Sequence, residues 1–304
     1  MSEESAAGPV RTVPEPLQRL GRDASFARGT WSSFIEVFGR RELLGRLISR
    51  EIRAKYKNSS LGIVWSLMRP LAQLLIYYVA IGQFLGAARS IPDFAIFVFT
   101  GLTAWALYSE IITAGTNSVV NNSGLVKKVY LPREIFPLAA VGASLFNFAV
   151  QFGILIVATL VLGRPPIHAD LAYLPLSVAL ILVFATALAL VLSALNVYLR
   201  DVQHLVEILL LVLFWASPIV YSVGFVHTAI GGTIWEQLYL ANPVTLAVLG
   251  MQKAMWMAGT TDTTQYWPDD LALRMLVATG ICLILLWIAQ RIFSRLQANF
   301  AQEL

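Results

Sequence analysis

The residues best placed for chemistry form a short charged segment, residues 125–134, between two long apolar runs. Its candidate functional members are Leu125, Lys127, Lys128, Tyr130, Leu131, Pro132, Arg133 and Glu134. A compact, charged, proline-containing turn between two membrane spans offers a surface on which a soluble partner can push. We therefore interpret the segment as a cytosolic handle of a driven machine rather than part of a passive anchor.

A second basic set lies in residues 41–57. Apolar residues recur there at helical spacing, and the positions between them are basic at Arg46, Arg50, Arg53, Lys55 and Lys57. Such a helix lies flat at the inner membrane interface, with its arginines toward lipid phosphates or an acidic partner. Two interpretations stay open: a lipid-lying anchor without a specific partner, and a docking surface for a soluble subunit.

Two ionisable residues stand out inside apolar runs, where charges are costly and usually face a bundle interior or a wet path. Arg69 lies near the inner end of the first run, so snorkelling to the headgroups competes with a functional role. Glu110 is the one charge of the second run, and a structural hydrogen bond or ion pair there is as well supported as a transport role. A lone carboxylate is not the relay expected of a proton-coupled carrier.

Aromatic residues make up 11% of the chain, and several lie within the apolar runs. Most are expected to be packing residues. Aromatic faces also stack on the apolar faces of sugar rings, so a path bordered by such rings would suit a glycan. The candidates for such a conduit are Tyr77, Tyr78, Phe84, Trp215 and Tyr221.

Several catalytic motifs are absent from the sequence. It contains no G-x-x-x-x-G-K-[ST] phosphate loop, no H-E-x-x-H and no G-x-S-x-G. The histidines, His168, His204 and His227, are scattered, so no metal site is predicted, and the single Cys282 excludes an intrachain disulfide. Catalysis within this chain is the weaker hypothesis.

Composition defines the class of protein that positions these residues. The chain has 57% hydrophobic and 13% charged residues and a mean hydropathy of +0.69, against roughly 25% charged residues in soluble domains. About 20 helical residues cross a bilayer, and the runs do not alternate as barrel strands do. We predict an all-α integral membrane protein with six spans, at 61–86, 94–118, 135–163, 171–199, from 205 to about 222, and 271–290.

The distribution of basic residues predicts the orientation. With both termini in the cytoplasm, only Arg89, Arg164, Lys253 and Arg274 of the 22 Lys and Arg residues fall on the outer side. The net charge of +4 does not indicate nucleic-acid binding, because the excess lies in inner loops that face anionic lipid headgroups.

The predicted organisation has four parts. A flexible cytosolic tail (1–40) precedes the interface helix (41–60), the six-span domain (61–294) and a short cytosolic tail (295–304). Residues 223–257 are too polar for a span and too apolar for an ordinary loop, so we expect short re-entrant or surface-lying helices on the outer side, broken near Asn242–Pro243.

Five segments together resemble the membrane subunit of ABC exporters of the polysaccharide-export type, which serve O-antigens, capsules, teichoic acids and related glycans. They are REIRAKYKNSSLGIVWSLMRPL, GLVKKVYLPREIFPLA, LNVYLRDVQHL, SPIVYS and ANPVT. The resemblance covers about residues 43–293.

The resemblance implies roles for particular residues. Residues 124–137 match the family's coupling helix, which sits in a groove of the ATPase subunit, and residues 41–57 match its interface helix. Arg200 and Asp201 match a motif on the second inner loop, and residues 223–257 match the outer re-entrant helices.

The resemblance also implies the partners and the cargo. Two copies of this chain join two copies of a separate ATPase that binds ATP and Mg²⁺, so no cofactor is expected on this chain. The first and fifth spans of both copies border the conduit, and the cargo is a polyprenyl-diphosphate-linked glycan crossing the bacterial plasma membrane. Two alternatives stay open: a membrane enzyme or scaffold of glycan assembly, and a permease for another lipid or a drug.

Overall fold

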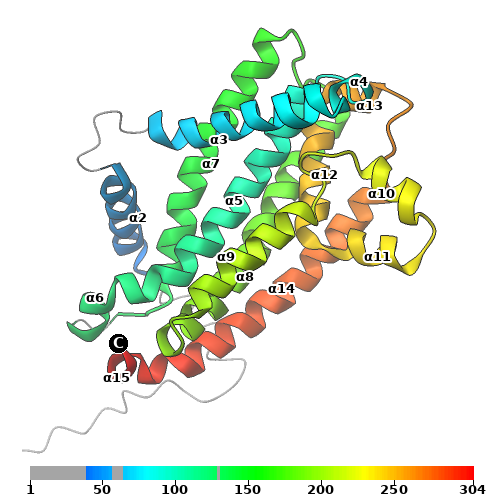
Figure 1. Ribbon diagram of the computed structural model, residues 1–304. Helices are drawn as coiled ribbons and strands as arrows, with labels where there is room; N and C mark the ends of the chain where they lie inside the picture. Colours follow the sequence, from blue (N-terminus) through cyan, green and yellow to red (C-terminus); the bar gives the residue numbers. More distant parts are fainter. Residues whose placement is uncertain (1–38, 57–63, 129–130) are drawn as a thin grey trace, which may run out of the picture.

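A computed structural model describes residues 39–56, 64–128 and 131–304 of the chain. Residues 1–38 of the predicted tail, together with Lys57 and Tyr130, lie outside the described residues. Within the described ranges the secondary structure is helical and contains no strand, as the composition predicted. Figure 1 shows the helices in a tilted bundle.

The helices follow the predicted order. They are α2 (Arg41–Tyr56), α3 (Val64–Tyr77), the π-helix η1 (Tyr78–Phe84), α4 (Ala87–Ser90), α5 (Phe94–Asn121), α6 (Ser123–Lys128), α7 (Ile135–Val161), η2 (Ala169–Ala172), α8 (Tyr173–Tyr198), α9 (Val202–Trp215), α10 (Val223–Ile230), α11 (Ile234–Ala241), α12 (Pro243–Met255), α13 (Met257–Thr261), α14 (Leu271–Leu296), η3 (Gln297–Asn299) and α15 (Phe300–Glu303).

Four stretches of the described chain are long and apolar enough to cross a membrane: Phe94–Asn121, Ile135–Val161, Ala169–Tyr198 and Leu271–Asn299. The other two predicted spans correspond to α3 continuing into η1, and to α9, which has 14 residues. Pro70 lies inside α3, and a π-helix follows it. The six-span count therefore stays a prediction.

α5 forms the centre of the bundle. It packs against α7, α8, α9 and α12, and 72% of the residues in its most apolar 18-residue stretch are buried. Gly115 allows α5 to approach α8 closely, because a Cβ there would lie 2.5 Å from the Cβ of Ala189. Small residues at helix crossings are the usual means of close packing inside a membrane, where lipid provides no hydrophobic drive between helices.

α12 also belongs to this core. It packs on α5, α8 and α14, and most of its residues are buried. Asn242 caps it by accepting a hydrogen bond from the N–H of Val244 (3.0 Å), and Pro243 occupies the first helical turn, where its missing N–H costs nothing. Within 223–257, then, α12 inserts into the bundle, whereas α10 and α11 lie at its end (Figure 1).

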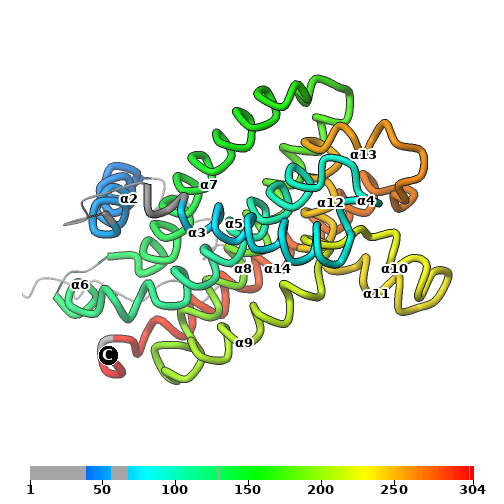
Figure 2. The backbone as a smooth tube through the Cα atoms, turned by 45° about the horizontal axis from the view of Figure 1, so that its top comes forward, coloured from blue at the N-terminus to red at the C-terminus, as the bar shows by residue number. Residues whose placement is uncertain are grey.

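The loops gather at two opposite ends. α6, α15 and the turn between α8 and α9 lie at one end, and α4, α10, α11 and α13 at the other (Figures 1 and 2). The loops predicted to be cytosolic thus share one end, which we call the coupling end. At the opposite end Trp256 Nε1 donates to the carbonyl of Pro92 (2.7 Å), and Arg164 pairs with Asp93 (3.2 Å).

Candidate functional site

The handle predicted from the sequence is a short helix followed by a turn, not one helix through residue 137. α6 ends at Lys128, residues 131–134 are non-helical, and α7 begins at Ile135. Proline disfavours α-helical backbone in the residue before it, so Leu131–Pro132 is a natural place for the helix to stop. The carbonyl of Pro132 then accepts from the N–H of Ile135 (3.1 Å) and closes the turn.

The handle has an exposed side and a buried side. Lys127 and Lys128 are exposed, whereas Pro132 and Glu134 are buried within the chain. Glu134 is 3% exposed and accepts hydrogen bonds from Ser294 Oγ (2.9 Å) and Gln290 Nε2 (3.2 Å), both on α14. Of the predicted coupling residues, the two lysines therefore face outward, and Glu134 faces the last long helix.

The basic helix α2 packs against α7. Its Leu47 is buried, and Ile48 fits over Gly142, where a Cβ would lie 2.5 Å from Ile48 Cδ1. Near its end Lys55 Nζ lies 2.5 Å from Glu110 Oε1 on α5. Asn147 on α7 donates to the same carboxylate oxygen (2.5 Å).

Glu110 thus joins three helices, α2, α5 and α7. This geometry supports the structural alternative for the lone carboxylate of the second apolar run, because the carboxylate is paired with a cation and an amide. The same ion pair occupies the ammonium of Lys55. Of the other predicted interface residues, Arg46 and Arg53 are exposed, and Arg50 is exposed but already bonded within the chain.

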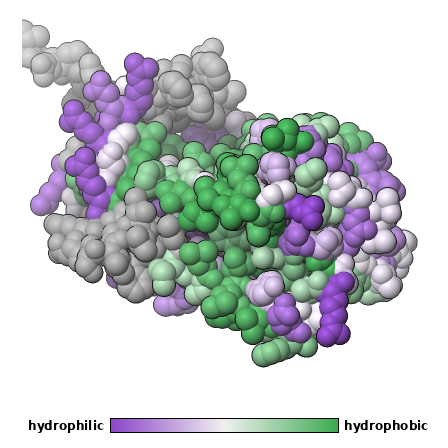
Figure 3. All heavy atoms as spheres, turned by 90° about the horizontal axis from the view of Figure 1, so that it is seen from above, coloured by the Kyte–Doolittle hydropathy of each residue, from purple (hydrophilic) through white to green (hydrophobic). Residues whose placement is uncertain are grey.

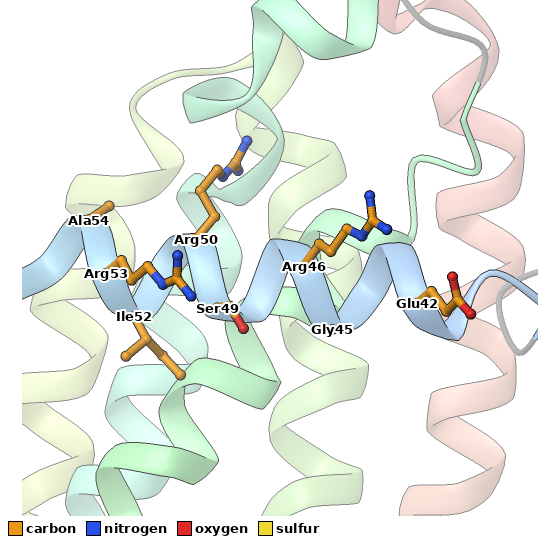
Figure 4. A pocket seen from close by; sticks show the side chains of 8 residues that line it. All are labelled: Glu42, Gly45, Arg46, Ser49, Arg50, Ile52, Arg53 and Ala54. Atoms are coloured by element: carbon orange, nitrogen blue, oxygen red, sulfur yellow. The ribbon is translucent and has the colours of Figure 1, made fainter.

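These three arginines line an open groove along α2. The described residues that line it all belong to α2: Glu42, Gly45, Arg46, Ser49, Arg50, Ile52, Arg53 and Ala54. Figure 4 shows these side chains arranged along a single helix. Arg50 also reaches Glu51 (2.7 Å) and Asn122 at the end of α5. Guanidinium groups in such an arrangement suit phosphate oxygens, which accept their N–H groups in pairs.

The predicted conduit residues fall into two groups. Tyr77 of α3 stacks on Phe214 of α9 (ring centroids 5.8 Å), and Trp215 lies edge-on to the same ring (5.5 Å). Tyr221 donates to the carbonyl of Trp215 (2.8 Å). The structure therefore brings Tyr77, Trp215 and Tyr221 into one aromatic neighbourhood around Phe214 and Trp215 at the end of α9.

The other two conduit candidates lie on the π-helix. Tyr78 packs against Phe94 (6.4 Å), whereas Phe84 is 82% exposed. Figure 3 shows the apolar side chains that gather in the middle of one face of the molecule. Because its ring is exposed, Phe84 does not join the aromatic neighbourhood of Tyr77.

Comparison with known proteins identifies the family. Residues 42–256 match the family described as ABC-2 type transporter. The chain belongs to this family. It is 29% identical over 269 residues to the O-antigen export system permease protein RfbA of Myxococcus xanthus, which covers 88% of this chain and 98% of that protein.

Other relatives carry related names. An O-antigen export system permease protein RfbA of Klebsiella pneumoniae is 26% identical, covering 86% of this chain and 95% of its own length. The polysialic acid transport protein KpsM of Escherichia coli is 24% identical, covering 66% of this chain and 76% of its own length. The resemblance expected from the sequence is confirmed, and this ABC-2 permease is an integral membrane protein.

The remaining predicted residues lie apart from these clusters. Arg69 is exposed on α3 of the permease. Arg200 and Asp201 are exposed in the turn at the coupling end, where the carbonyl of Asp201 accepts from the N–H groups of His204 and Leu205 (3.1 Å each) and starts α9.

Sequence reasoning missed a polar cluster at the end opposite the coupling end. Glu236 of α11 is buried and lies 2.6 Å from Nδ1 of His227 on α10, and it accepts from the N–H of Gly232 (2.9 Å) and the hydroxyl of Tyr266 (3.4 Å). The His227 and Tyr266 rings stack at 3.8 Å. The hydrogen bond with His227, with that from Gly232 N–H next, lowers the pKa of Glu236 below its usual range. A carboxylate in an otherwise apolar helix was the available signal.

Proposed function

We propose that this ABC-2 permease is the membrane half of an ATP-driven exporter that moves a polyprenyl-diphosphate-linked polysaccharide from the cytosol across the bacterial plasma membrane. The observation that carries the proposal is the likeness over 98% of the length of a protein named as an O-antigen export permease. A relative named for polysialic acid transport extends the likeness to a second polysaccharide class.

The power source is a separate ATPase subunit, present in two copies beside two copies of the permease. ATP and Mg²⁺ bound in that subunit supply the work. The permease contributes the handle. Lys127 and Lys128 on α6 are exposed at the coupling end and so are accessible to the ATPase. In this proposal the coupling end and both termini lie on the cytosolic side. Movement of the ATPase subunits displaces α6 and the turn behind it.

The cargo is received at α2. The groove lined by Arg46, Arg50 and Arg53 binds the diphosphate, and the polyprenyl chain stays in lipid. The proposed phosphate site is compatible with the packing of α2, because Lys55 and Glu110 hold the helix from its other side and leave the groove open.

The glycan then passes along a path bordered by α3 and α9 of both copies. Tyr77, Trp215 and Tyr221 lie at this border: Trp215 presents an exposed ring face on which sugars stack, while Tyr77 packs on Phe214 and Tyr221 donates to the carbonyl of Trp215. Trp215 is 52% exposed in the single chain, so its ring is available to a ligand.

Depletion of the permease in its native cell tests the proposal. We expect a lipid-linked polysaccharide to accumulate on the inner leaflet and to disappear from the cell surface, with recovery when the chain is expressed again. Extracted lipid-linked glycans are identified by mass spectrometry. Unchanged surface polysaccharide, or ATP hydrolysis by the purified chain alone, would contradict the proposal.

A further inference from the structure

The last residues of the chain are folded into the coupling end rather than forming a tail. α14 continues to Leu296, and η3 and α15 turn back beneath α6 (Figure 1). Phe300 of α15 is fully buried, at 0% exposure. Residues 297–304 contain one aromatic side chain, so their sequence shows no periodic pattern that predicts this packing.

Phe300 touches three different elements. Its ring lies edge-on to Phe293 of α14 (5.5 Å) and to Tyr198 at the end of α8 (6.1 Å). The guanidinium carbon of Arg133, in the turn behind α6, lies 5.8 Å from the ring centroid, within the range of a cation–π contact. Tyr198 closes the arrangement by donating to the carbonyl of Leu296 (2.7 Å).

Glu134, the neighbour of Arg133, makes the second link to the same segment. Its carboxylate is buried against Ser294 and Gln290 in the last turns of α14. A buried carboxylate costs free energy unless its oxygens are hydrogen-bonded, so these two bonds favour the turn staying beside α14. Two consecutive residues of the handle are thus attached to residues 290–304, which we call the C-terminal clamp.

We propose that the C-terminal clamp makes the handle and the end of α14 move as one body, so that displacement of α6 reaches α14 and α8 as well as the flanking α5 and α7. Phe300 is a positioning residue in this scheme: it holds Arg133, Phe293 and Tyr198 in fixed relation. The inference rests on the proposed function and adds a route by which movement of the ATPase is transmitted to the helix bundle.

The first test compares Phe300→Ala with Phe300→Leu in the full permease purified with its ATPase. Phe300→Ala leaves the ring contacts without a partner, whereas Phe300→Leu keeps most of the apolar volume. We expect Phe300→Ala to copurify with the ATPase and to hydrolyse ATP as the unmodified complex does, while polysaccharide export falls about tenfold, the size of change found for residues that couple distant sites. Phe300→Leu keeps export within about twofold.

The second test measures the movement directly and does not depend on a weakened variant. In a Cys282→Ser background, spin labels at Lys128→Cys and Gln302→Cys, both exposed positions, report the distance between α6 and α15. Labelled permease is mixed with an excess of unlabelled permease, so that each complex contains at most one labelled copy. We expect this distance to stay constant when the ATPase is trapped with nucleotide, while a pair at Lys128→Cys and Thr228→Cys changes.

The outcomes separate this inference from the proposed function. If the unmodified permease neither copurifies with an ATPase nor supports export, the proposed function fails and the inference fails with it. If it does both, normal export by Phe300→Ala or a nucleotide-dependent change between positions 128 and 302 overturns the inference alone.

Discussion

The centre and the flanks of this permease are held together by different means. The central helices, α5, α8 and α12, approach one another at small residues: Gly115 of α5 faces Ala189 of α8, and Gly250 of α12 faces Ser177 of α8, with a Cβ at either glycine lying 2.5 Å from its neighbour. The flanking helices, α2, α3 with η1, and α9, meet the rest of the bundle mainly through longer side chains. Phe214 of α9 packs edge-on to Trp105 of α5 (5.5 Å), and Lys55 of α2 pairs with Glu110 of α5. The fit of Ile48 over Gly142, between α2 and α7, is a close approach on this side.

This difference indicates which parts can move. Interdigitated backbones separate only with loss of many close contacts, whereas a stacked ring or an ion pair can shift at modest cost. The proposed ligand groups lie on the flanks, on α2, α3 and α9. The centre therefore forms the frame, and the flanks carry the groups proposed to meet cargo.

The largest expected effect comes from enlarging a glycine of the centre. Gly115→Val places new atoms against Ala189, whose Cβ already lies 2.5 Å from the position of a Cβ at residue 115. Overpacking of this kind costs about 1–3 kcal/mol, so we expect a clear fall in the melting temperature of the detergent-solubilised protein. The measurement is thermal unfolding followed by size-exclusion chromatography.

Gly153→Val is the matched control on α7. Gly153 is exposed, and nothing lies within 4 Å of a Cβ built there, so the same substitution adds the same atoms without a clash. Equal melting temperatures for the two variants would show that the α5–α8 crossing is not the rigid centre described above.

The next effect concerns the flank that is proposed to receive phosphates. Replacing Arg46, Arg50 and Arg53 together by Gln removes three positive charges from the groove on α2 and leaves its apolar face unchanged. Each basic residue near an anionic surface contributes about 1 kcal/mol, so export should fall at least tenfold while the melting temperature stays constant. Surface polysaccharide per permease molecule is the readout.

Triple replacement of the same arginines by Lys keeps the charge and loses the planar fork. We expect intermediate export if the ligand is bound in part through paired hydrogen bonds. Export by the Gln variant at the level of the unmodified permease would remove the phosphate site from the proposed function.

A smaller effect is expected where α2 meets the centre. Lys55 and Glu110 are 48% and 25% exposed, so their ion pair is partly screened by solvent, and a double-mutant cycle with Lys55→Gln and Glu110→Gln should give a coupling energy of about 0.5–1 kcal/mol. The cycle is measured on the free energy of unfolding in mixed detergent. A coupling energy of zero would show that the apolar face of α2 alone, through Leu47 and Ile48, holds it against α7.

The sequence predicted the frame well because that part of the fold depends on local composition. Four apolar stretches with few charges had to become long helices. The observed limits of the first three differ from the predicted ones by at most three residues, whereas the last extends to Asn299 rather than residue 290. α2 followed from its helical spacing of Leu and Ile. The first predicted span was less accurate, because counting apolar residues does not reveal that Pro70 interrupts the helix or that a seven-residue π-helix follows it.

The site could be predicted only in part, because its contacts join distant positions. Lys127 and Glu134 were both assigned to the handle, but the direction in which each points depends on α14, and Ser294 is 160 residues beyond Glu134. Glu110 was left with two roles, and its pairing with Lys55 across 55 residues favours one. Contacts between residues so far apart in the chain leave no local pattern in a single sequence.

The smallest expected effect lies in the α10–α11 hairpin, at the end opposite the coupling end, where Glu236 is held by His227, Gly232 and Tyr266. Because its pKa in the fold is below the ordinary value of 4.5, ionised Glu236 stabilises the hairpin above that pH, and the contribution is lost as the pH falls through the lowered pKa. Hydrogen exchange of residues 224–240, after correction for intrinsic rates, should therefore accelerate as the pH falls below about 4, the ordinary range of a glutamate carboxyl. Glu236→Gln should abolish this acid step, and Asp262→Asn, in the loop after α13, should leave it intact. An acid step that persists in Glu236→Gln would assign the hairpin's stability to its apolar packing, as at the centre.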